Sequence, residues 1–284
     1  MNYYLGLDIG GTTIKAVLMR DFNDKEPQCF GIDTPKSKKE FLRILQEFTK
    51  KILFEQSRED TIKGGSQPRS NNIIKGIGAG LPGILDPKRE VLLKAPHLPF
   101  LNGWRPKEFF KKFGAAVQIE NDANCFVLAE HKRGAAKGYK NVVGLAVGTG
   151  IGGGIIMNGK LYRGSHGSAG EFGHTILRIK NPELRIMNTE KLEELAAKKA
   201  FEKYGDRSKI IGTGVANLIN SLDPDIVVLG GGGVASGEIK MNTVRQVAKQ
   251  NILSPLVKKT PIVRGKLGEY TQAMGAVLLL KNSS

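Results

Sequence analysis

The stretch from Leu5 to Lys15, LGLDIGGTTIK, constrains the fold of this chain more than any other feature of its sequence. Apolar residues alternate with small or polar residues as far as Ile9, two glycines follow, and a second apolar run begins at Ile14. This pattern predicts two antiparallel strands joined by a tight turn. The chain therefore begins with a β-hairpin whose tip is formed by glycines.

The tip of this hairpin has the residue types that suit an anion. Two adjacent glycines lack Cβ, so their amides can approach a phosphate closely, and two hydroxyls and one positive charge follow. The carboxylate just before the tip would then face a metal-bound phosphate. An ordinary hairpin with an Asp-capped turn is the alternative. The residues expected around the phosphate are Asp8, Gly10, Gly11, Thr12, Thr13 and Lys15.

Composition bounds the class of protein. A chain of 284 residues suggests one large or two ordinary domains. No apolar run reaches the roughly 18 residues of a membrane span, and the N-terminus begins a strand pattern rather than a signal peptide. Cys29 and Cys125 are the only cysteines, too few for a disulfide framework. We therefore expect a cytoplasmic protein without membrane contact.

The formal net charge of +16 has three interpretations: a solvated basic surface, attraction of an anionic small molecule, or binding of nucleic acid. Nucleic-acid binding usually gathers Lys and Arg on one element. Here they are scattered along the chain, for example at residues 36–39, 111–112 and 258–259. We expect no nucleic-acid partner, and a charge that helps to collect a polyanion such as ATP.

Two segments in the first half are candidate ligand contacts. Residues 73–79 are predicted as a strand that ends in the turn Gly80 to Gly83, whose backbone could approach a ligand. Residues 96–104 are rich in Pro and Gly and carry Asn102 beside the only Trp. This composition predicts a loop near a domain boundary, with a packed surface loop as the alternative.

Asn121 and Asp122 follow a short predicted strand and immediately precede an apolar-periodic helix. Such residues can be helix caps. Equally, the pair can place a carboxylate where a substrate hydroxyl would donate its proton, since a helix N-terminus favours the ionised base. The local sequence does not decide between these two roles.

A second glycine-rich stretch, residues 148–154, follows the predicted strand of residues 142–147. Three of its glycines have the spacing of the dinucleotide-binding fingerprint, but that fingerprint requires a following helix. Residues 155–162 instead have the pattern strand, Asn-Gly turn and strand. We therefore interpret the stretch as a second hairpin tip that cradles phosphates, through Gly148, Thr149, Gly150 and Gly152.

Residues 165–174 form a glycine-rich connection that carries Glu171 and His174. These two side chains could chelate a metal or bind sugar hydroxyls, and a metal is disfavoured because no further ligand follows at a suitable spacing. Thr189 is expected to cap an amphipathic helix that contains Glu193 near its start and extends to Phe201.

A third glycine run follows the predicted strand of residues 225–229 and precedes a helical stretch. An adenine nucleotide could sit there, on Gly230, Gly231, Gly232 and Gly233. NAD or NADP is disfavoured, because the next strand is followed by Arg264 and Lys266 rather than by an acidic residue. Residues 269–280 are predicted as an apolar helix with close-packing positions at Gly275 and Ala276.

Four of these motifs, in this order, resemble the ROK family of sugar kinases and repressors within the actin-like ATPase superfamily, and the resemblance covers nearly the whole chain. The motifs are Leu7-Asp-Ile-Gly-Gly-Thr-Thr13, Glu120-Asn-Asp-Ala-Asn124, Gly148 to Gly154 and Gly170-Glu-Phe-Gly-His174. The resemblance implies an α/β, ribonuclease H-like fold with two domains around an active-site cleft. We expect a small domain at residues 1–120, completed by a helix at 270–284, and a large domain at 121–269.

The resemblance also implies roles for the motif residues. Asp122 would be the general base for a sugar hydroxyl, both hairpin tips would hold the phosphates of ATP, and Asp8 would hold Mg²⁺, directly or through water. A homodimer is expected. The sugar contacts would be Gly83, Asn102, Asn121, Asp122, Glu171, His174 and Glu193.

One departure from the family pattern concerns zinc. Many members follow the histidine with a cysteine-rich loop that binds structural zinc, whereas residues 176–189 contain no cysteine. We therefore expect no structural zinc, which leaves His174 available for substrate. The departure is similar to zinc-lacking relatives, some of which use inorganic polyphosphate, so that donor stays open.

The function expected from the sequence is an ATP-dependent, glucokinase-like hexose kinase acting at the 6-hydroxyl. The alternatives are a kinase for N-acetylmannosamine, N-acetylglucosamine, mannose, fructose or a glucoside, and a polyphosphate-using glucokinase. A sugar-sensing regulator without catalysis is the alternative from another class. Family repressors carry a DNA-binding domain ahead of the kinase-like part, and we expect none here because the hairpin already begins at Leu5.

Overall fold

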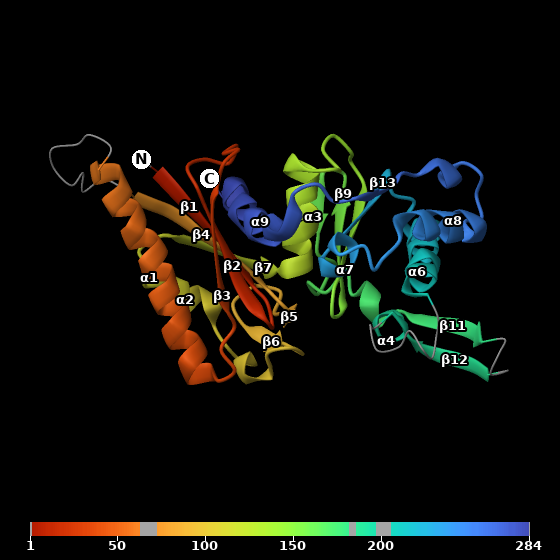
Figure 1. The fold of residues 1–284 in the computed structure, drawn as a ribbon, viewed down its shortest axis with the longest axis horizontal. Coiled ribbons are helices and arrows are strands. Elements are labelled where there is room, and N and C mark those ends of the chain that lie inside the picture. Colours follow the sequence, from red (N-terminus) through yellow and green to blue (C-terminus); the bar gives the residue numbers. More distant parts are fainter. Residues whose placement is uncertain (1, 63–72, 182–185, 197–205, 284) are drawn as a thin grey trace. The chain divides into compact units, whose positions relative to one another are not determined.

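The computed structural model describes the chain except for residues 1, 63–72, 182–185, 197–205 and 284 (Figure 1). The described residues form two compact units, which are considered one at a time. Unit 1 contains Met1–Cys125 and Gln272–Ser284, and unit 2 contains Phe126–Thr271. The division falls inside a helix, α3 (Asp122–Arg133), rather than between residues 120 and 121. Among the described helices, none has the length and apolar character needed to cross a membrane.

Unit 1 is built on a five-stranded sheet of order β3-β2-β1-β4-β7. The predicted hairpin is confirmed, because β1 pairs antiparallel with β2 and places Asp8 opposite Lys15. β3 adds antiparallel to β2, whereas β4 and β7 continue the sheet parallel to β1. The strands are β1 (Asn2–Ile9), β2 (Thr13–Met19), β3 (Gln28–Asp33), β4 (Ile73–Leu81) and β7 (Ala116–Asn121).

Helices cover both faces of this sheet (Figure 1). On one face the alternating Leu5, Leu7 and Ile9 belong to the same buried cluster as Phe41 of α1 (Lys38–Ile62). On the other face the intervening Gly6 lets α9 (Thr271–Leu279) approach so closely that any Cβ at this position would collide with the helix backbone. The alternation of large residues and glycine along β1 therefore sets the distance of each helix from the sheet.

The segment after β4 packs on the core of unit 1 through its buried residues. It contains β5 (Ile84–Leu85), β6 (Leu92–Lys94), a 3₁₀ turn at Pro99–Leu101 and α2 (Pro106–Lys111). Trp104 is buried and makes edge contacts with the rings of Phe41 and Phe109. Residues 96–104 are a loop with one 3₁₀ turn, as predicted, but they lie within unit 1 and not at its boundary, so the alternative of a packed surface loop is the one that the structure shows.

Unit 2 repeats the strand pattern of unit 1. Its sheet has the order β10-β9-β8-β13-β14, in which β8 pairs antiparallel with β9 and parallel with β13. β10 adds antiparallel to β9, and β14 adds parallel to β13. The strands are β8 (Val142–Val147), β9 (Ile151–Met157), β10 (Lys160–Tyr162), β13 (Ile226–Gly230) and β14 (Ile262–Arg264).

The two faces of this second sheet pack into different clusters. Val143, Leu145 and Val147 of β8 share one cluster with α6 (Arg207–Leu222) and α8 (Met241–Asn251). The opposite face packs on α3, where a Cβ at Gly144 would collide with Val127. Shorter elements of unit 2 are a 3₁₀ turn at Phe172–His174, α4 (Leu192–Leu195), α7 (Gly232–Ala235) and 3₁₀ turns at Val257–Lys259 and Gly268–Tyr270. A last 3₁₀ turn, Leu280–Ser283, follows α9 in unit 1.

Two sequence predictions about unit 2 were wrong in detail. β9 already begins at Ile151, so Gly152 to Gly154 lie in a strand and the hairpin tip contains only residues 148–150. Thr189 is not a helix cap, because it lies in a second hairpin, β11 (Ile176–Asn181) and β12 (Ile186–Lys191), and α4 begins only after Lys191. The expected continuation of that helix to Phe201 lies outside the described residues.

Candidate functional site

The start of α3 separates the two roles that the sequence left open for Asn121 and Asp122. The Asn121 Oδ1 atom accepts hydrogen bonds from the amides of Ala123 (2.9 Å) and Asn124 (3.1 Å), which is the geometry of a helix N-cap. Asp122 also accepts from the Ala123 amide, at 2.9 Å, and stays partly exposed. The cap is thus made by Asn121, and the carboxylate of Asp122 lies at the positive end of the helix.

Asp8 lies close enough to Asp122 for their charges to interact. The pKa of Asp8 is raised to about 7, because loss of hydration and the negative charge of Asp122 both raise it and the ammonium group of Lys15 only partly opposes them. These three side chains come from the end of β1, the start of β2 and the start of α3. Unit 1 therefore concentrates two carboxylates beside its glycine turn.

This pair of carboxylates suits Mg²⁺. The ion prefers hard oxygen ligands and usually takes one or two carboxylates, with the remaining positions filled by water and substrate phosphate. Among the described residues there is no group of three His, Cys, Asp or Glu side chains that could hold a metal alone. A cation shared with a phosphate would also offset the repulsion that raises the pKa of Asp8. The residues present fit such an ion, which Asp8 would hold.

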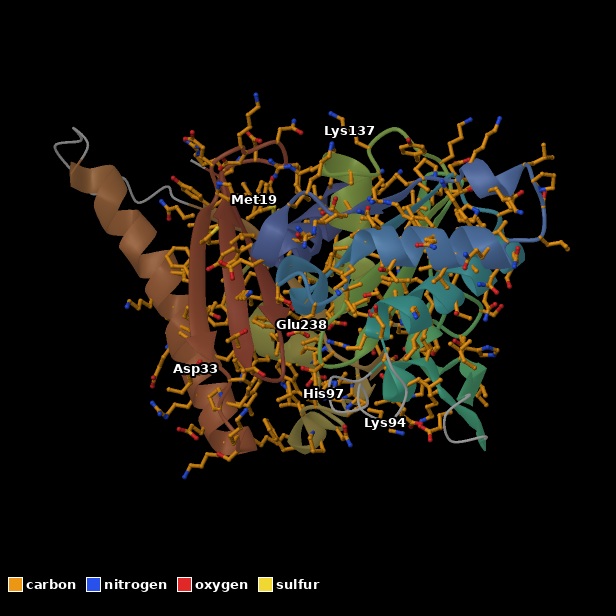
Figure 2. All side chains as sticks on the ribbon, turned by 45° about the vertical axis from the view of Figure 1, so that its right-hand side comes forward. Met19, Asp33, Lys94, His97, Lys137 and Glu238 are labelled. Carbon is orange, nitrogen blue, oxygen red and sulfur yellow. The ribbon has the colours of Figure 1, made fainter. Side chains whose placement is uncertain are left out.

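The glycine turn of unit 1 is braced by three neighbours. Thr34 donates its hydroxyl to the carbonyl of Gly10 at 2.7 Å, and Lys36 donates from Nζ to the carbonyl of Gly11 at 3.1 Å. His97, labelled in Figure 2, lies against Gly11, where a Cβ would come within 2.9 Å of the His97 Cβ. With its carbonyls held in this way, the turn leaves the exposed Thr12 at its tip.

A chain of contacts connects the loop after β6 to the start of α3. The Ala95 amide donates to Oδ1 of Asn102 at 2.9 Å, and Asn121 donates from Nδ2 to the carbonyl of Gly83 at 3.1 Å. Gly83 has a φ of +102°, and a Cβ there would collide with the carbonyl of Lys94. The structure thus brings Gly83, Asn102 and Asn121 into one corner of unit 1.

Beneath this corner lies a buried ion pair. Glu120 is fully buried, and its Oε1 lies 3.2 Å from Nε of Arg89. The same oxygen accepts from the Asn121 amide at 2.9 Å and from Nδ2 of Asn124 at 3.1 Å. Arg89 adopts a left-handed backbone conformation, with a φ of 57°. The pair fixes the residues on either side of Asp122, and sequence reasoning gave Arg89 no role.

Unit 2 brings together the three side chains expected to bind a sugar. His174 Nδ1 lies 3.9 Å from Oε2 of Glu171, and its Nε2 lies 3.6 Å from Oε1 of Glu193. Burial raises the pKa of Glu171, the neighbouring His174 lowers it, and the charge of Glu193 raises it. All three side chains keep exposed surface. Two carboxylates joined through an imidazole can each accept a hydrogen bond from a hydroxyl.

The glycine runs of unit 2 meet at the end of β8. Gly231 has a φ of +86° and packs on the backbone of Val147, next to the turn at residues 148–150. Gly148 and Gly232 have open space where a Cβ would project, and Thr149 is exposed. Gly230, by contrast, is buried, and a Cβ there would collide with the ring of Phe126 in α3.

Comparison with known proteins gives a consistent result. The ROK family matches residues 4–209 and 196–283 of the chain. A glucokinase of Thermotoga maritima is 26% identical over 98% of the chain and 96% of its own length. An N-acetyl-D-glucosamine kinase of Photobacterium profundum is 29% identical over 97% of the chain and 98% of its own length.

Solved structures agree in fold. A ROK family glucokinase from Streptomyces griseus, in complex with glucose and AMPPNP, has a TM-score of 0.76 at 23% identity and covers 98% of both chains. A ROK hexokinase from Thermus thermophilus has a TM-score of 0.71 at 28% identity and covers 99% of this chain. The two sheet-based units are those of the actin-like ATPase fold. The chain belongs to the ROK family, and it is a sugar kinase.

Proposed function

We propose that the chain is an ATP-dependent hexose kinase that phosphorylates the 6-hydroxyl of glucose. The observation that carries this proposal is the start of α3, where Asn121 makes the cap and Asp122 presents a partly exposed carboxylate. A helix N-terminus favours the ionised form of such a carboxylate. This is the state that a general base needs in order to accept a proton.

The reaction assigns one task to each group of residues. The hydroxyl oxygen attacks the γ-phosphorus, the bond from phosphorus to the β,γ-bridging oxygen breaks, and the hydroxyl proton passes to Asp122. Glu171, His174 and Glu193 orient the sugar through its other hydroxyls. The two glycine turns donate backbone amides to the phosphates. Mg²⁺ held by Asp8 would neutralise phosphate charge, and most of the remaining rate enhancement comes from positioning.

Glucose is proposed as the sugar because the carboxylates of Glu171 and Glu193 suit hydroxyl donors. A site built to bind a hydroxyl rejects an analogue that lacks it by as much as roughly 10⁴-fold, because a polar group is then left unpaired. A relative named as an N-acetyl-D-glucosamine kinase makes an acetylated sugar the second candidate.

A coupled assay over a panel of sugars, with ATP and with inorganic polyphosphate as donors, tests the proposal. We expect the highest kcat/KM for glucose with ATP, and little turnover of 2-deoxyglucose. Turnover of N-acetylglucosamine or N-acetylmannosamine, with no turnover of glucose, would show that the proposed sugar is wrong and would leave the proposed mechanism standing. A higher kcat/KM with polyphosphate than with ATP would make polyphosphate the donor. No turnover of any sugar would overturn the proposal.

A further inference from the structure

Arg207, the first residue of α6, is a buried arginine that holds three separate segments of unit 2. Its Nε donates to the carbonyl of Ala196 at 2.6 Å, and its Nη1 donates to Oε2 of Glu238 at 2.6 Å. Its Nη2 donates to the carbonyl of Gly148 at 3.4 Å. The side chain is only 7% exposed. One guanidinium group therefore contacts positions that lie 11, 31 and 59 residues away in the sequence.

Each of these segments carries or adjoins a part of the proposed site. Ala196 caps the C-terminus of α4, the helix that contains Glu193. Gly148 begins the phosphate turn. Glu238, labelled in Figure 2, lies in the segment that joins α7 to α8 and follows the glycine run at residues 230–233. Arg207 thus contacts the sugar-binding helix, the phosphate turn and the segment after the adenine loop within one unit.

We propose that Arg207 is a positioning residue. It fixes the position of Glu193 relative to the Gly148 turn, so that the sugar and the nucleotide are bound at a fixed distance and orientation to each other. This inference rests on the proposed function. A planar guanidinium has donors in three directions at fixed angles, and a lysine ammonium on a flexible stem does not reproduce them. Glu238 balances the buried charge, as a buried cation requires.

The neighbouring contacts support this role. The hydroxyl of Ser208, next to Arg207, accepts a hydrogen bond from the Lys240 amide at 2.9 Å. The start of α6 therefore contacts the segment between α7 and α8 at two points, Glu238 and Lys240. In the Gly148 turn the amide of Gly148 donates to the carbonyl of Gly150 at 2.9 Å, and among the described residues beyond its chain neighbours no atom lies within 4 Å of where a Cβ of Gly148 would project. Its carbonyl is the group that Arg207 holds.

Kinetics of Arg207→Lys test the inference, with Arg245→Lys as the matched control. Arg245 also donates to a backbone carbonyl, that of Ile262 at 2.8 Å, and to a side chain, Asn242 at 3.0 Å, and among the described residues neither of these partners belongs to a proposed site segment. We expect Arg207→Lys to raise the KM of both sugar and ATP and to lower kcat/KM by roughly 10- to 100-fold, the effect of a displacement of about 1 Å. Arg245→Lys should leave both KM values within about twofold of wild type.

Chemical rescue separates positioning from folding. Millimolar guanidinium chloride should restore kcat/KM at least several-fold in Arg207→Ala and should not raise it in Arg245→Ala. Loss of thermal stability in both Arg207 variants with unchanged KM values would overturn the inference, as would a rise in the KM of only one substrate. If Arg207→Ala does not fold, the two KM values of Arg207→Lys decide.

Binding measurements distinguish failure of this inference from failure of the proposed function. Calorimetry with glucose and AMPPNP reports both affinities without turnover. If the wild-type protein binds glucose and AMPPNP but turns over no sugar, the proposed function is wrong and the positioning role of Arg207 is not contradicted. Unchanged affinities for both ligands in Arg207→Lys, with an active wild type, would remove the positioning role alone.

Discussion

The two units share one strand order, yet their hairpin tips have different surroundings. In both sheets the central strand is followed by an antiparallel partner across a glycine turn, Gly10 to Thr12 in unit 1 and Gly148 to Gly150 in unit 2. In unit 1 an aspartate stands two residues before the turn, at Asp8. The corresponding position in unit 2, Ala146, has no charge.

The bracing of the two turns also differs. The turn of unit 1 is held by Thr34 and Lys36 and is covered by His97. The turn of unit 2 is held through one carbonyl by Arg207, and among the described residues nothing occupies the space where a Cβ of Gly148 would project. The two acidic side chains of unit 2 that are proposed to bind sugar, Glu171 and Glu193, lie outside its sheet. The same scaffold thus carries the acidic groups proposed for phosphoryl transfer in one copy and those proposed for sugar recognition in the other.

The largest effect is expected at the acidic centre of unit 1. Asp122→Asn keeps the shape of the side chain but removes the proton acceptor, so kcat should fall by roughly 10²- to 10⁴-fold. Affinities for sugar and for AMPPNP should change little, because other residues are proposed to hold both ligands. Steady-state kinetics and calorimetry measure the two quantities.

The exposed carboxylate of Glu108, in the first turn of α2, provides the control for this change. Glu108→Gln should leave kcat within about twofold of wild type, since surface substitutions usually have small effects. A near-normal kcat for Asp122→Asn would reduce Asp122 to a structural residue at the start of the helix.

The next effect is expected at the sugar-binding side chains of unit 2. Glu171→Gln removes a charged hydrogen-bond acceptor, an interaction of about 1.5–3 kcal/mol, so the sugar KM should rise by roughly 10- to 100-fold. The KM of ATP should stay within about twofold, because Glu171 is proposed to contact sugar alone. An equal rise in the KM of sugar and the KM of ATP would contradict the proposal that Glu171 contacts only the sugar.

A smaller effect is expected from alanine in the two glycine turns. Gly148→Ala has room for its Cβ, so the thermal unfolding midpoint should stay near that of wild type while the KM of ATP rises by roughly tenfold, because the methyl group keeps the phosphate from the amides. Gly11→Ala would place its Cβ 2.9 Å from that of His97, so it should also lower the unfolding midpoint. A Gly148→Ala variant with an unchanged KM would place the phosphates elsewhere.

The hairpins and motifs were predictable because their signals are local. Alternation of apolar residues around Gly10 and around Asn158-Gly159 gave β1, β2, β9 and β10, and the left-handed φ of Asn158 (52°) and Gly159 (75°) is what an Asn-Gly turn requires. The helix start at Asp122 followed from its cap. These features depend on neighbours within a few residues.

Features that depend on distant partners were not predictable. Nothing in the sequence near Arg207 or Arg89 indicates a carbonyl 59 residues away or a carboxylate at residue 120. Residues 96–104 have the composition of a loop and form one, but the packing of Trp104 on Phe41, which attaches this loop to the core of unit 1, could not be predicted from it. The hairpin β11–β12 was missed because its strands pair mainly with each other, so they need no strong apolar alternation.

The second hairpins of the two sheets offer the last and smallest test. β9 and β10 are joined by the two-residue Asn158-Gly159 turn, whereas β2 and β3 are joined by a longer loop closed by Arg20 and Asp24. Asp24 accepts from the Arg20 amide at 2.9 Å and from the Arg20 guanidinium at 3.1 and 3.0 Å. These hydrogen bonds lower the pKa of Asp24 to about 2.

The sign of the resulting pH dependence follows from this lowered pKa. The ionised carboxylate stabilises the folded state above the unfolded pKa of about 4, and its contribution is lost as the pH falls from about 4 to about 2. Asp24→Asn cannot accept at both oxygens, so its free energy of unfolding in urea should be below that of wild type at pH 7, and the difference should shrink at pH 3. Glu47→Gln, which breaks the exposed pair with Arg43, should show no such difference. A gap between Asp24→Asn and wild type that stays constant from pH 7 to pH 3 would mean that the loop is closed by its backbone turn and not by the ion pair.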